Sequence, residues 1–378
     1  MINYLKNMRA STRKKCFILL GMVIVFVILQ ISISTGALSF QMKNMLVQIC
    51  YNVILAISLN LVVGILGELS LGHAGFMCIG AFMGAYVIKI MTVLYPDLSA
   101  WVVYPIAFLI GGVVAAVFGL LVGCTILRLK GDYLAIVTLA VGEIIWNVFS
   151  VIYCAIDEGK LRFSFRPIED LSLDAQIIAD GPKGVTGIPK MSRDVGVRFT
   201  IAFVITFVSV WLILNFIHSR TGHAVKAYRD NRIAAESIGI NITKYRLITI
   251  IVSAFFAGIA GVLYSTELGM TAATQNNFGY IMSINILVFV VLGGMGSTLG
   301  SIIAAVILTV LPEMLRFLND YRMLIYAVVL VGMMLINNNP KISSYIDAFK
   351  KKIKSKFSKK ANKFSEKLES KIAKDKEA

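Results

Sequence analysis

The chain has 378 residues, of which 57% are apolar and 15% are charged, and its formal net charge is +16. A soluble domain carries about 25% charged residues. The mean hydropathy is +0.79, and several apolar runs reach the ~20 residues that cross a bilayer. This composition excludes an ordinary soluble globular protein and predicts an all-α polytopic membrane protein.

The location of the positive charge argues against nucleic acid as a partner. Thirteen lysines lie in the last 38 residues, and most other basic residues cluster in short loops. Membrane proteins keep Lys and Arg on the cytoplasmic side, whereas nucleic-acid binding needs a fold that presents them. The cysteines have no metal-site or redox spacing, so we expect packing roles for them and no metal site.

Apolar runs predict about ten transmembrane segments in one transmembrane domain covering residues 16–337. The basic N-terminus, 1–15, precedes the first run, which is long and lacks a cleavage site, so we expect an uncleaved span. Two Gly-rich segments, at 64–80 and 292–300, are predicted to be broken or re-entrant. The predicted spans are 16–35, 44–66, 70–93, 101–127, 132–153, 198–217, 245–266, 281–299, 300–317 and 322–337.

We expect the protein to lie in the cell membrane, and the distribution of charge predicts that both termini are on the cytoplasmic side. If both termini are cytoplasmic, the segments on that side of the membrane, together with Arg246, contain 26 of the 37 Lys and Arg residues. The positive-inside rule requires such an excess. The external loop, 154–197, together with Arg198, carries seven basic and seven acidic residues. A loop of this length has a function or is disordered, so docking of an external partner and a solvated linker both remain open. The cytoplasmic segments are 1–15, 128–131, 218–244 and 338–378.

The tail at 338–378 is Lys-rich and has apolar residues at steps of three or four. This periodicity predicts an amphipathic helix that contacts anionic membrane lipid, and the alternative is a solvated, partly disordered tail. The periodic residues are Phe349, Ile353, Phe357, Ala361, Phe364, Leu368 and Ile372.

The cytoplasmic loop at 218–246 contains a short helix, predicted from Asp230 through Ile238. Asp230 or Asn231 is a suitable N-cap, and Gly239 is a suitable end. The helix would have a small apolar face, made by Ile233, Ala234 and Ile238, that fits a groove of a cytoplasmic partner. An ordinary polar loop is the alternative interpretation.

Three motifs give this chain a family resemblance. Ala234-Ala235 followed by Gly239-Ile240 resembles the cytoplasmic loop of ABC importer membrane subunits, and the continuation at 245–261 is similar to the branched-chain amino acid permease family. The stretches 59–81 and 291–300 are similar to the two other signatures of that family. The resemblance covers about 45–315, and the external loop and extra first span resemble the longer, M-type subunit.

The resemblance implies a permease subunit without enzymatic activity, coupled to partners. These are a second permease subunit, two cytoplasmic ABC ATPase subunits that hold ATP and Mg, and an extracytoplasmic solute-binding protein. The implied cargo is leucine, isoleucine or valine. His223 stands where the family commonly has Arg, and the expected proline before Phe278 is missing. The implied ATPase-coupling residues are Arg229, Asp230, Asn231, Ala234, Ala235, Glu236 and Gly239.

A Gly-rich segment in each half of the chain also indicates a substrate path, because broken spans expose polar backbone to a cavity. Tight helix packing is the rival explanation. We expect Glu68 and His73 to form a polar pair near a cytoplasmic gate, and Glu143 to line the path or to fix helix packing. The candidate path or gate residues are Glu68, Ser70, Gly72, His73, Glu143, Gly293, Gly294 and Gly296.

The main alternative is a stand-alone secondary transporter or channel for a small solute. Such a transporter needs carboxylates within the spans for ion coupling, and Glu143 and Glu267 are a small supply of them. The chain has no G-x-x-x-x-G-K-[ST] sequence, so we expect ATP to bind elsewhere. H-E-x-x-H and G-x-S-x-G sequences are also absent, and we predict no catalytic residues. A structural or assembly protein is a third class.

Overall fold

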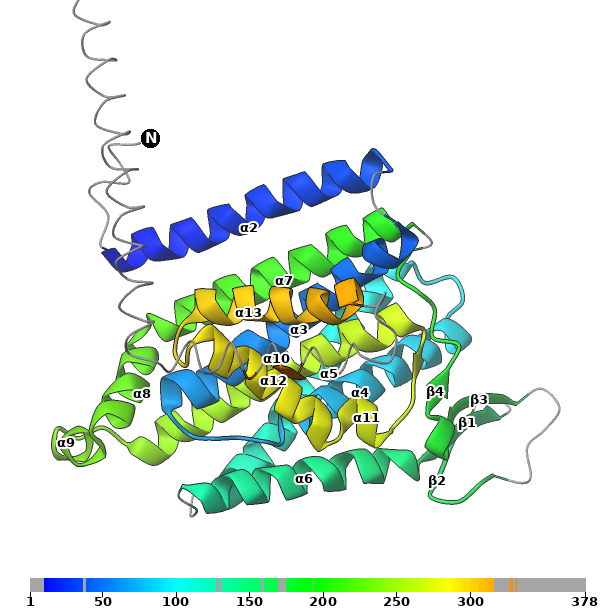
Figure 1. The fold of residues 1–378 in the computed structure, drawn as a ribbon. Helices are drawn as coiled ribbons and strands as arrows, with labels where there is room; N and C mark the ends of the chain where they lie inside the picture. Colours follow the sequence, from blue (N-terminus) through cyan, green and yellow to red (C-terminus); the bar gives the residue numbers. More distant parts are fainter. Residues whose placement is uncertain are drawn as a thin grey trace, which may run out of the picture. The chain divides into compact units, whose positions relative to one another are not determined.

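The computed structural model describes residues 10–315 apart from short gaps, together with 327, 328 and 331 (Figure 1). The described residues from Ala10 to Glu313 belong to one compact unit. The tail at 338–378 lies outside the described residues, as does most of the tenth predicted span. The gaps are 37–38, 127–128, 130, 158–159, 169–174 and 193.

The described residues are mostly helical. The longer helices are α2 (Ala10–Ser34), α3 (Phe40–Asn60), α4 (His73–Leu94), α5 (Ala100–Ile126), α6 (Asp132–Ser150), α7 (Val195–Ile217), α10 (Ile242–Leu268), α12 (Tyr280–Gly293) and α13 (Thr298–Met314). The shorter ones are the π-helix η1 (Leu61–Leu66), the 3-10 turn η2 (Gly181–Lys183), α8 (Arg220–Asp230), α9 (Arg232–Ser237) and α11 (Gln275–Phe278). The strands are β1 (Tyr153–Asp157), β2 (Lys160–Ser164), β3 (Gln176–Asp180), β4 (Val185–Thr186) and β5 (Met270–Thr271).

Seven helical segments in the described part of the chain are long and apolar enough to cross a membrane. Two further apolar helices, Ile18–Ser34 and Thr298–Met314, are shorter. The first nine predicted apolar runs all coincide with helices, which confirms a multi-pass membrane protein. The total of ten spans stays a prediction. The seven segments are Gln41–Leu66, His73–Leu94, Ala100–Thr125, Tyr133–Ser150, Val195–Ile217, Ile242–Leu268 and Gln275–Gly293.

Small residues bring α4 and α10 together in the core. A Cβ atom built on Gly80 would overlap the backbone of Gly258, and one on Gly261 would overlap the carbonyl oxygen of Met77. Backbones that approach this closely give membrane helices their packing energy, because lipid supplies no hydrophobic force between helices. Gly80 and Gly258 therefore act as packing residues in the described structure.

Both Gly-rich segments interrupt their helices. η1 ends at Gly67, whose φ of 82° is left-handed, and regular helix resumes only at His73. In the second half, Gly294 and Gly296 have φ values of 88° and 83° between α12 and α13. Glycine adopts this conformation without the Cβ clash that other residues meet. The predicted breaks are present, and a re-entrant course for either segment stays a prediction.

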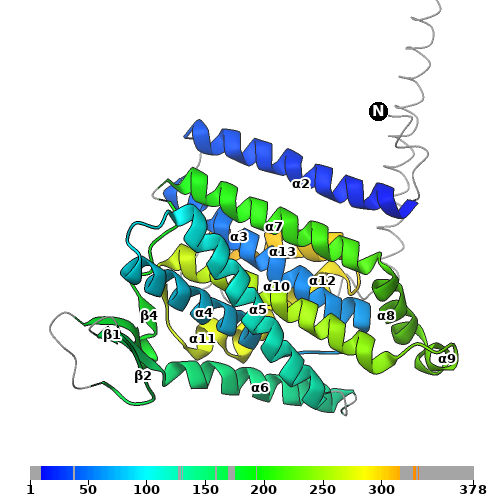
Figure 2. The same ribbon diagram turned by 180° about the vertical axis from the view of Figure 1, so that it is seen from behind.

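The loop at 154–197 contains β structure that the sequence did not reveal. β1 pairs with β2 and β3 in an antiparallel sheet of order β2-β1-β3, and β4 pairs with β5, which follows α10. The Nζ atom of Lys89, on α4, donates to the carbonyl oxygens of Ile177 (2.6 Å) and Thr186 (2.8 Å). The loop is thus tied to the helices, at the end opposite to α8 and α9 (Figure 2).

Candidate functional site

The predicted short helix is α9, and the structure selects its cap. The Oδ1 atom of Asn231 accepts a hydrogen bond from the Ala234 amide at 3.1 Å, so Asn231 rather than Asp230 begins the helix. The chain turns at Gly239, which has a φ of 83°. Ile233 and Ile238 are 79% and 74% exposed. Exposed aliphatic side chains outside a span are suited to contact with a partner.

Ala234 and Ala235 are neighbours in the motif but differ in their exposure to solvent. Ala234 is exposed, whereas Ala235 is buried at 1% exposure. Glu236 is exposed and pairs with Arg232 at 3.1 Å. A bulky charge at position 235 would therefore disturb the packing of this chain, and Ile233 is the better position at which to test a partner contact.

Arg229, on α8, reaches the place where the two Gly-rich segments meet. One guanidinium nitrogen donates to the carbonyl oxygen of Gly64 at 2.8 Å. The amide of Gly296 donates to Oδ1 of the buried Asn60 at 2.9 Å. A Cβ atom on Gly64 would overlap both Asn60 Oδ1 and the Gly296 amide. We call this contact of Asn60, Gly64, Arg229 and Gly296 the glycine junction.

Arg229 has two further contacts near the glycine junction. Its Nε and NH2 atoms donate to Oδ1 of Asp230 at 3.2 and 3.0 Å, and both side chains of this pair are exposed. The aliphatic part of Arg229 lies against Gly67, where a Cβ atom would come within 2.7 Å of Arg229 Cγ. The predicted coupling segment and both predicted glycine segments are therefore in direct contact.

Glu68 forms a second connection between the first Gly-rich segment and the loop at 218–246. Its Oε1 atom accepts a hydrogen bond from the Tyr228 hydroxyl at 2.9 Å and forms an ion pair with Arg246, at the start of α10. The Glu68 and Arg246 side chains are 11% and 6% exposed. Burial of the phenol, and then the nearby Glu68 carboxylate, raise the pKa of Tyr228, so at neutral pH the hydroxyl stays protonated and donates to Glu68.

His73 begins α4 and points into the helices. Its Nε2 atom lies 2.8 Å from the hydroxyl of Ser58, and the side chain is 2% exposed. The Ser253 hydroxyl donates to the carbonyl oxygen of Ser58 at 2.6 Å, and the amide of Ala74 donates to Ser283 at 3.1 Å. These bonds tie the start of α4 to α3 and α12, and they tie α3 to α10.

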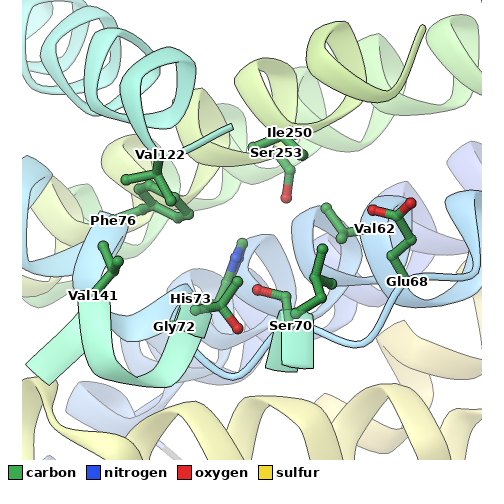
Figure 3. A pocket seen from close by; sticks show the side chains of 12 residues that line it. Val62, Glu68, Ser70, Gly72, His73, Phe76, Val122, Val141, Ile250 and Ser253 are labelled. Atoms are coloured by element: carbon green, nitrogen blue, oxygen red, sulfur yellow. The ribbon is translucent and has the colours of Figure 1, made fainter. Parts of the chain in front are cut away.

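The predicted polar pair of Glu68 and His73 is wrong. Both residues line one cavity, together with Ser70 and Ser253 (Figure 3), but each forms its bonds elsewhere. The turn after Gly67 directs Glu68 toward Tyr228 and Arg246, whereas His73 lies in the first turn of α4. The cavity has a volume of about 20 Å³, close to the space that one water molecule needs. It is too small to hold an amino acid.

Glu143 joins two helices rather than lining the cavity. Its Oε2 atom accepts from the indole nitrogen of Trp146 at 2.6 Å, and its Oε1 atom accepts from the Tyr280 amide at 2.7 Å. Tyr280 is the first residue of α12, where backbone amides lack helical partners and a carboxylate is favourable. Of the two roles predicted for Glu143, these contacts fit the fixing of helix packing.

The remaining predicted path residues lie at tight backbone contacts. A Cβ atom on Gly72 would overlap the carbonyl oxygen of Thr138, and one on Gly293 would come within 2.5 Å of Gly300. Ser70 is buried at 7% exposure beside Gly72, and Gly294 forms the turn after α12. Their described contacts suit helix packing, and a role in a solute path stays a prediction.

A second buried ion pair lies at the opposite end of α10. Arg198 donates from NH1 to Oε1 of Glu267 at 2.8 Å, and the two side chains are 6% and 11% exposed. Arg198 NH2 also donates to Asn44 at 3.3 Å. The sequence marks Glu267 as an ionisable residue near a span end but does not give its partner. A buried carboxylate needs a cation, and that rule is the signal that could have identified the pair.

Comparison with known proteins identifies the family to which this chain is similar. Residues 41–336 match the family described as "Branched-chain amino acid transport system / permease component". The chain is 31% identical over 354 residues to the high-affinity branched-chain amino acid transport system permease protein LivM of Salmonella typhimurium, covering 86% of this chain and 74% of that protein.

More distant relatives are other permeases. The permease protein LivH of Salmonella typhimurium is 24% identical over 259 residues, covering 68% of this chain and 79% of LivH. The ribose import permease protein RbsC of Haemophilus influenzae is 26% identical over 302 residues, covering 78% and 84%. No solved structure matched the chain. The chain belongs to the family of permease components of branched-chain amino acid transport systems.

Proposed function

We propose that this permease subunit works in an ATP-driven importer and that α8 and α9 transmit the movement of its ATPase subunits. The observation that carries the proposal is the glycine junction, where Arg229 from α8 binds the carbonyl oxygen of Gly64 at 2.8 Å. Side chains of one loop thus contact both broken segments. In this proposal a displacement of α8 changes the contact between Gly64 and Gly296 and so couples a partner to the helices.

The exposed face of α9 supplies the surface for the ATPase. Ile233 and Ile238 stand out from the protein, while the buried Ala235 and the bonds of Arg229 and Tyr228 hold the segment to the spans. A helix that is apolar outward and anchored inward can transfer force, because it is attached on both sides. ATP and Mg bind to the two ATPase subunits in this proposal, and this chain holds neither.

The other partners follow from the family. A second permease subunit of the kind that LivH represents completes the translocation path, and an extracytoplasmic solute-binding protein delivers the cargo.

The protein lies in the inner or plasma membrane. Both termini and the 218–246 loop are on the cytoplasmic side, and the loop at 154–197 is on the external side. The Lys-rich tail contacts anionic membrane lipid. The cargo is leucine, isoleucine or valine, as the name of LivM suggests.

Replacing Ile233 by Asp tests the docking of the ATPase. We expect the variant to recover at least tenfold less ATPase when the importer is purified through this chain, because a central apolar contact contributes about 2 kcal/mol or more to binding. The chain itself should be produced at its normal level, since Ile233 is 79% exposed. The measurement is the ratio of ATPase to permease in the purified complex.

Leu98→Asp is the matched control. Leu98 is 40% exposed and lies in the loop between α4 and α5, at the other end of the spans. It should leave the ATPase ratio unchanged. Equal recovery of the ATPase with Ile233→Asp and Leu98→Asp would rule out α9 as the docking surface.

The cargo is tested by uptake into vesicles that contain the assembled importer and its binding protein. ATP-dependent uptake of labelled leucine that unlabelled isoleucine and valine suppress, and that ribose does not, is the expected result. Suppression by ribose alone would contradict the cargo assignment and leave the importer assignment intact, because RbsC, a ribose import permease, is also a relative.

A further inference from the structure

The edge strand β2 carries apolar side chains that nothing in the described structure covers. Leu161, Phe163 and Phe165, which follows the strand, are 51%, 54% and 63% exposed. The rings of Phe163 and Phe165 contact each other edge to face, with centroids 5.4 Å apart. These residues lie outside the candidate membrane-spanning helices, so they are not the lipid-facing side chains of a span. A contiguous apolar surface of this kind marks an interaction site.

The pairing of β2 with β1 shows which residues of β1 share this surface. Leu161 lies opposite Ile156, and Phe163 lies opposite Cys154. Opposite residues of an antiparallel pair project from the same face of a sheet. Ile156 and Cys154 are buried at 6% and 5% exposure, and Cys154 lies close to Tyr86 of α4. Ala155 and Asp157, on the opposite face of β1, are also buried, at 1% and 5% exposure. Both faces of β1 are therefore covered, and β2 carries the face of Cys154 and Ile156 outward to the edge of the sheet.

The opposite face of β2 is basic. Arg162 alternates with Leu161 and Phe163 along the strand, and its side chain remains 51% exposed although it pairs with Asp157 at 3.2 Å. Arg166 follows Phe165 and is exposed. Alternation of apolar and cationic residues gives an amphipathic strand, because successive side chains point to opposite faces.

The position of the sheet sets the depth of β2. β1 begins at Tyr153, three residues after the candidate span Tyr133–Ser150 ends, so the sheet lies level with the end of that span. Figure 1 shows β2 at the edge of the sheet on the side of α6. Amphipathic elements with Phe or Leu on one face and Lys or Arg on the other lie at this depth.

We propose that β2 lies in the phospholipid interface at this end of the spans. Leu161, Phe163 and Phe165 enter the upper acyl region, and Arg162 and Arg166 face the headgroup phosphates. The charge selects this occupant, because a strand with one apolar and one cationic face matches the boundary between the acyl chains and the anionic phosphates of phospholipids. The strand fixes the sheet against the membrane, and through β1, β3 and Lys89 it also fixes the end of α4.

Nitroxide labels on the two faces of the sheet test the proposal. Phe163→Cys labels the apolar face, and Ile177→Cys labels the opposite face at a similar exposure, 49%. Ile177 pairs with Ala155, which alternates with Cys154 along β1. Cys16 and the exposed Cys124 are replaced by Ser, and the labelled full chain is studied in the assembled importer in phospholipid vesicles. The accessibilities to oxygen, which concentrates in lipid, and to a water-soluble nickel chelate are measured.

We expect the label at Phe163 to be reached by oxygen at least tenfold better, relative to the chelate, than the label at Ile177. Leu161→Cys should repeat the result for Phe163 if that variant folds poorly. Equal chelate access at both faces would show that β2 lies in water and would overturn the proposal. Exclusion of both reagents from Phe163 would show that a protein partner covers the strand, which would also overturn it.

Discussion

Replacing Gly64 by Ala should abolish transport and destabilise the protein. The added methyl group would overlap the Asn60 side-chain oxygen and the Gly296 amide. Gly296 is held in place by its own hydrogen bond to Asn60, and Asn60 is fully buried, so the neighbours have little room to move. Overpacking of this kind costs about 3 kcal/mol. We expect uptake to fall to background and thermal unfolding to occur about 5–10 °C lower.

Gly21→Ala is the control for this prediction. Gly21 is helical, and no atom lies within 4 Å of a Cβ atom built there. Alanine is also the better helix former, by about 1 kcal/mol. The Gly21→Ala variant should therefore transport normally and unfold at or above the temperature of the unchanged protein. Normal uptake by Gly64→Ala would show that the two Gly-rich segments do not meet as described.

Replacing Arg246 by Met should destabilise the protein by a similar amount for an electrostatic reason. The substitution leaves the carboxylate of Glu68 buried at 11% exposure without the cation that pairs with it. Removing one partner of a buried ion pair costs about 3–5 kcal/mol, because the remaining charge stays out of water. Thermal unfolding of the purified chain in detergent measures the loss.

Two further variants separate this effect from lost packing. Glu68→Gln combined with Arg246→Met removes both charges and keeps an oxygen that accepts from Tyr228, so it should recover most of the stability. Arg232→Met breaks the exposed pair with Glu236 and should cost less than about 1 kcal/mol. Equal losses for Arg246→Met and Arg232→Met would contradict the assignment of Glu68 and Arg246 as a buried pair.

The sequence was informative where a physical rule acts locally. Long apolar runs predict spans because the bilayer has a fixed thickness, and the first nine runs are all helices. Short-range capping chemistry predicted α9, and the structure confirmed its end at Gly239 and chose Asn231 between two candidate caps. Glycine composition predicted breaks in two helices, and both breaks are present.

The sequence failed where a partner lies far along the chain. The sequence suggests that Glu68 pairs with His73, five residues away. Its partners in the structure are Tyr228 and Arg246, more than 150 residues away. No local pattern encodes such a pairing, because it depends on how the helices pack. The same reason applies to β5, a two-residue strand after α10 that pairs with β4. The contact between the two Gly-rich segments was also beyond prediction from one sequence.

The central claim is that Arg229 connects the ATPase to the glycine junction, and the amount of leucine taken up per ATP hydrolysed tests it most directly. In vesicles with the assembled importer, Arg229→Ala should keep its ATPases and continue to hydrolyse ATP, while leucine uptake per ATP falls about tenfold or more. Arg220→Ala changes an exposed residue at the start of the same helix and should leave the ratio unchanged. A normal ratio for Arg229→Ala would contradict the claim.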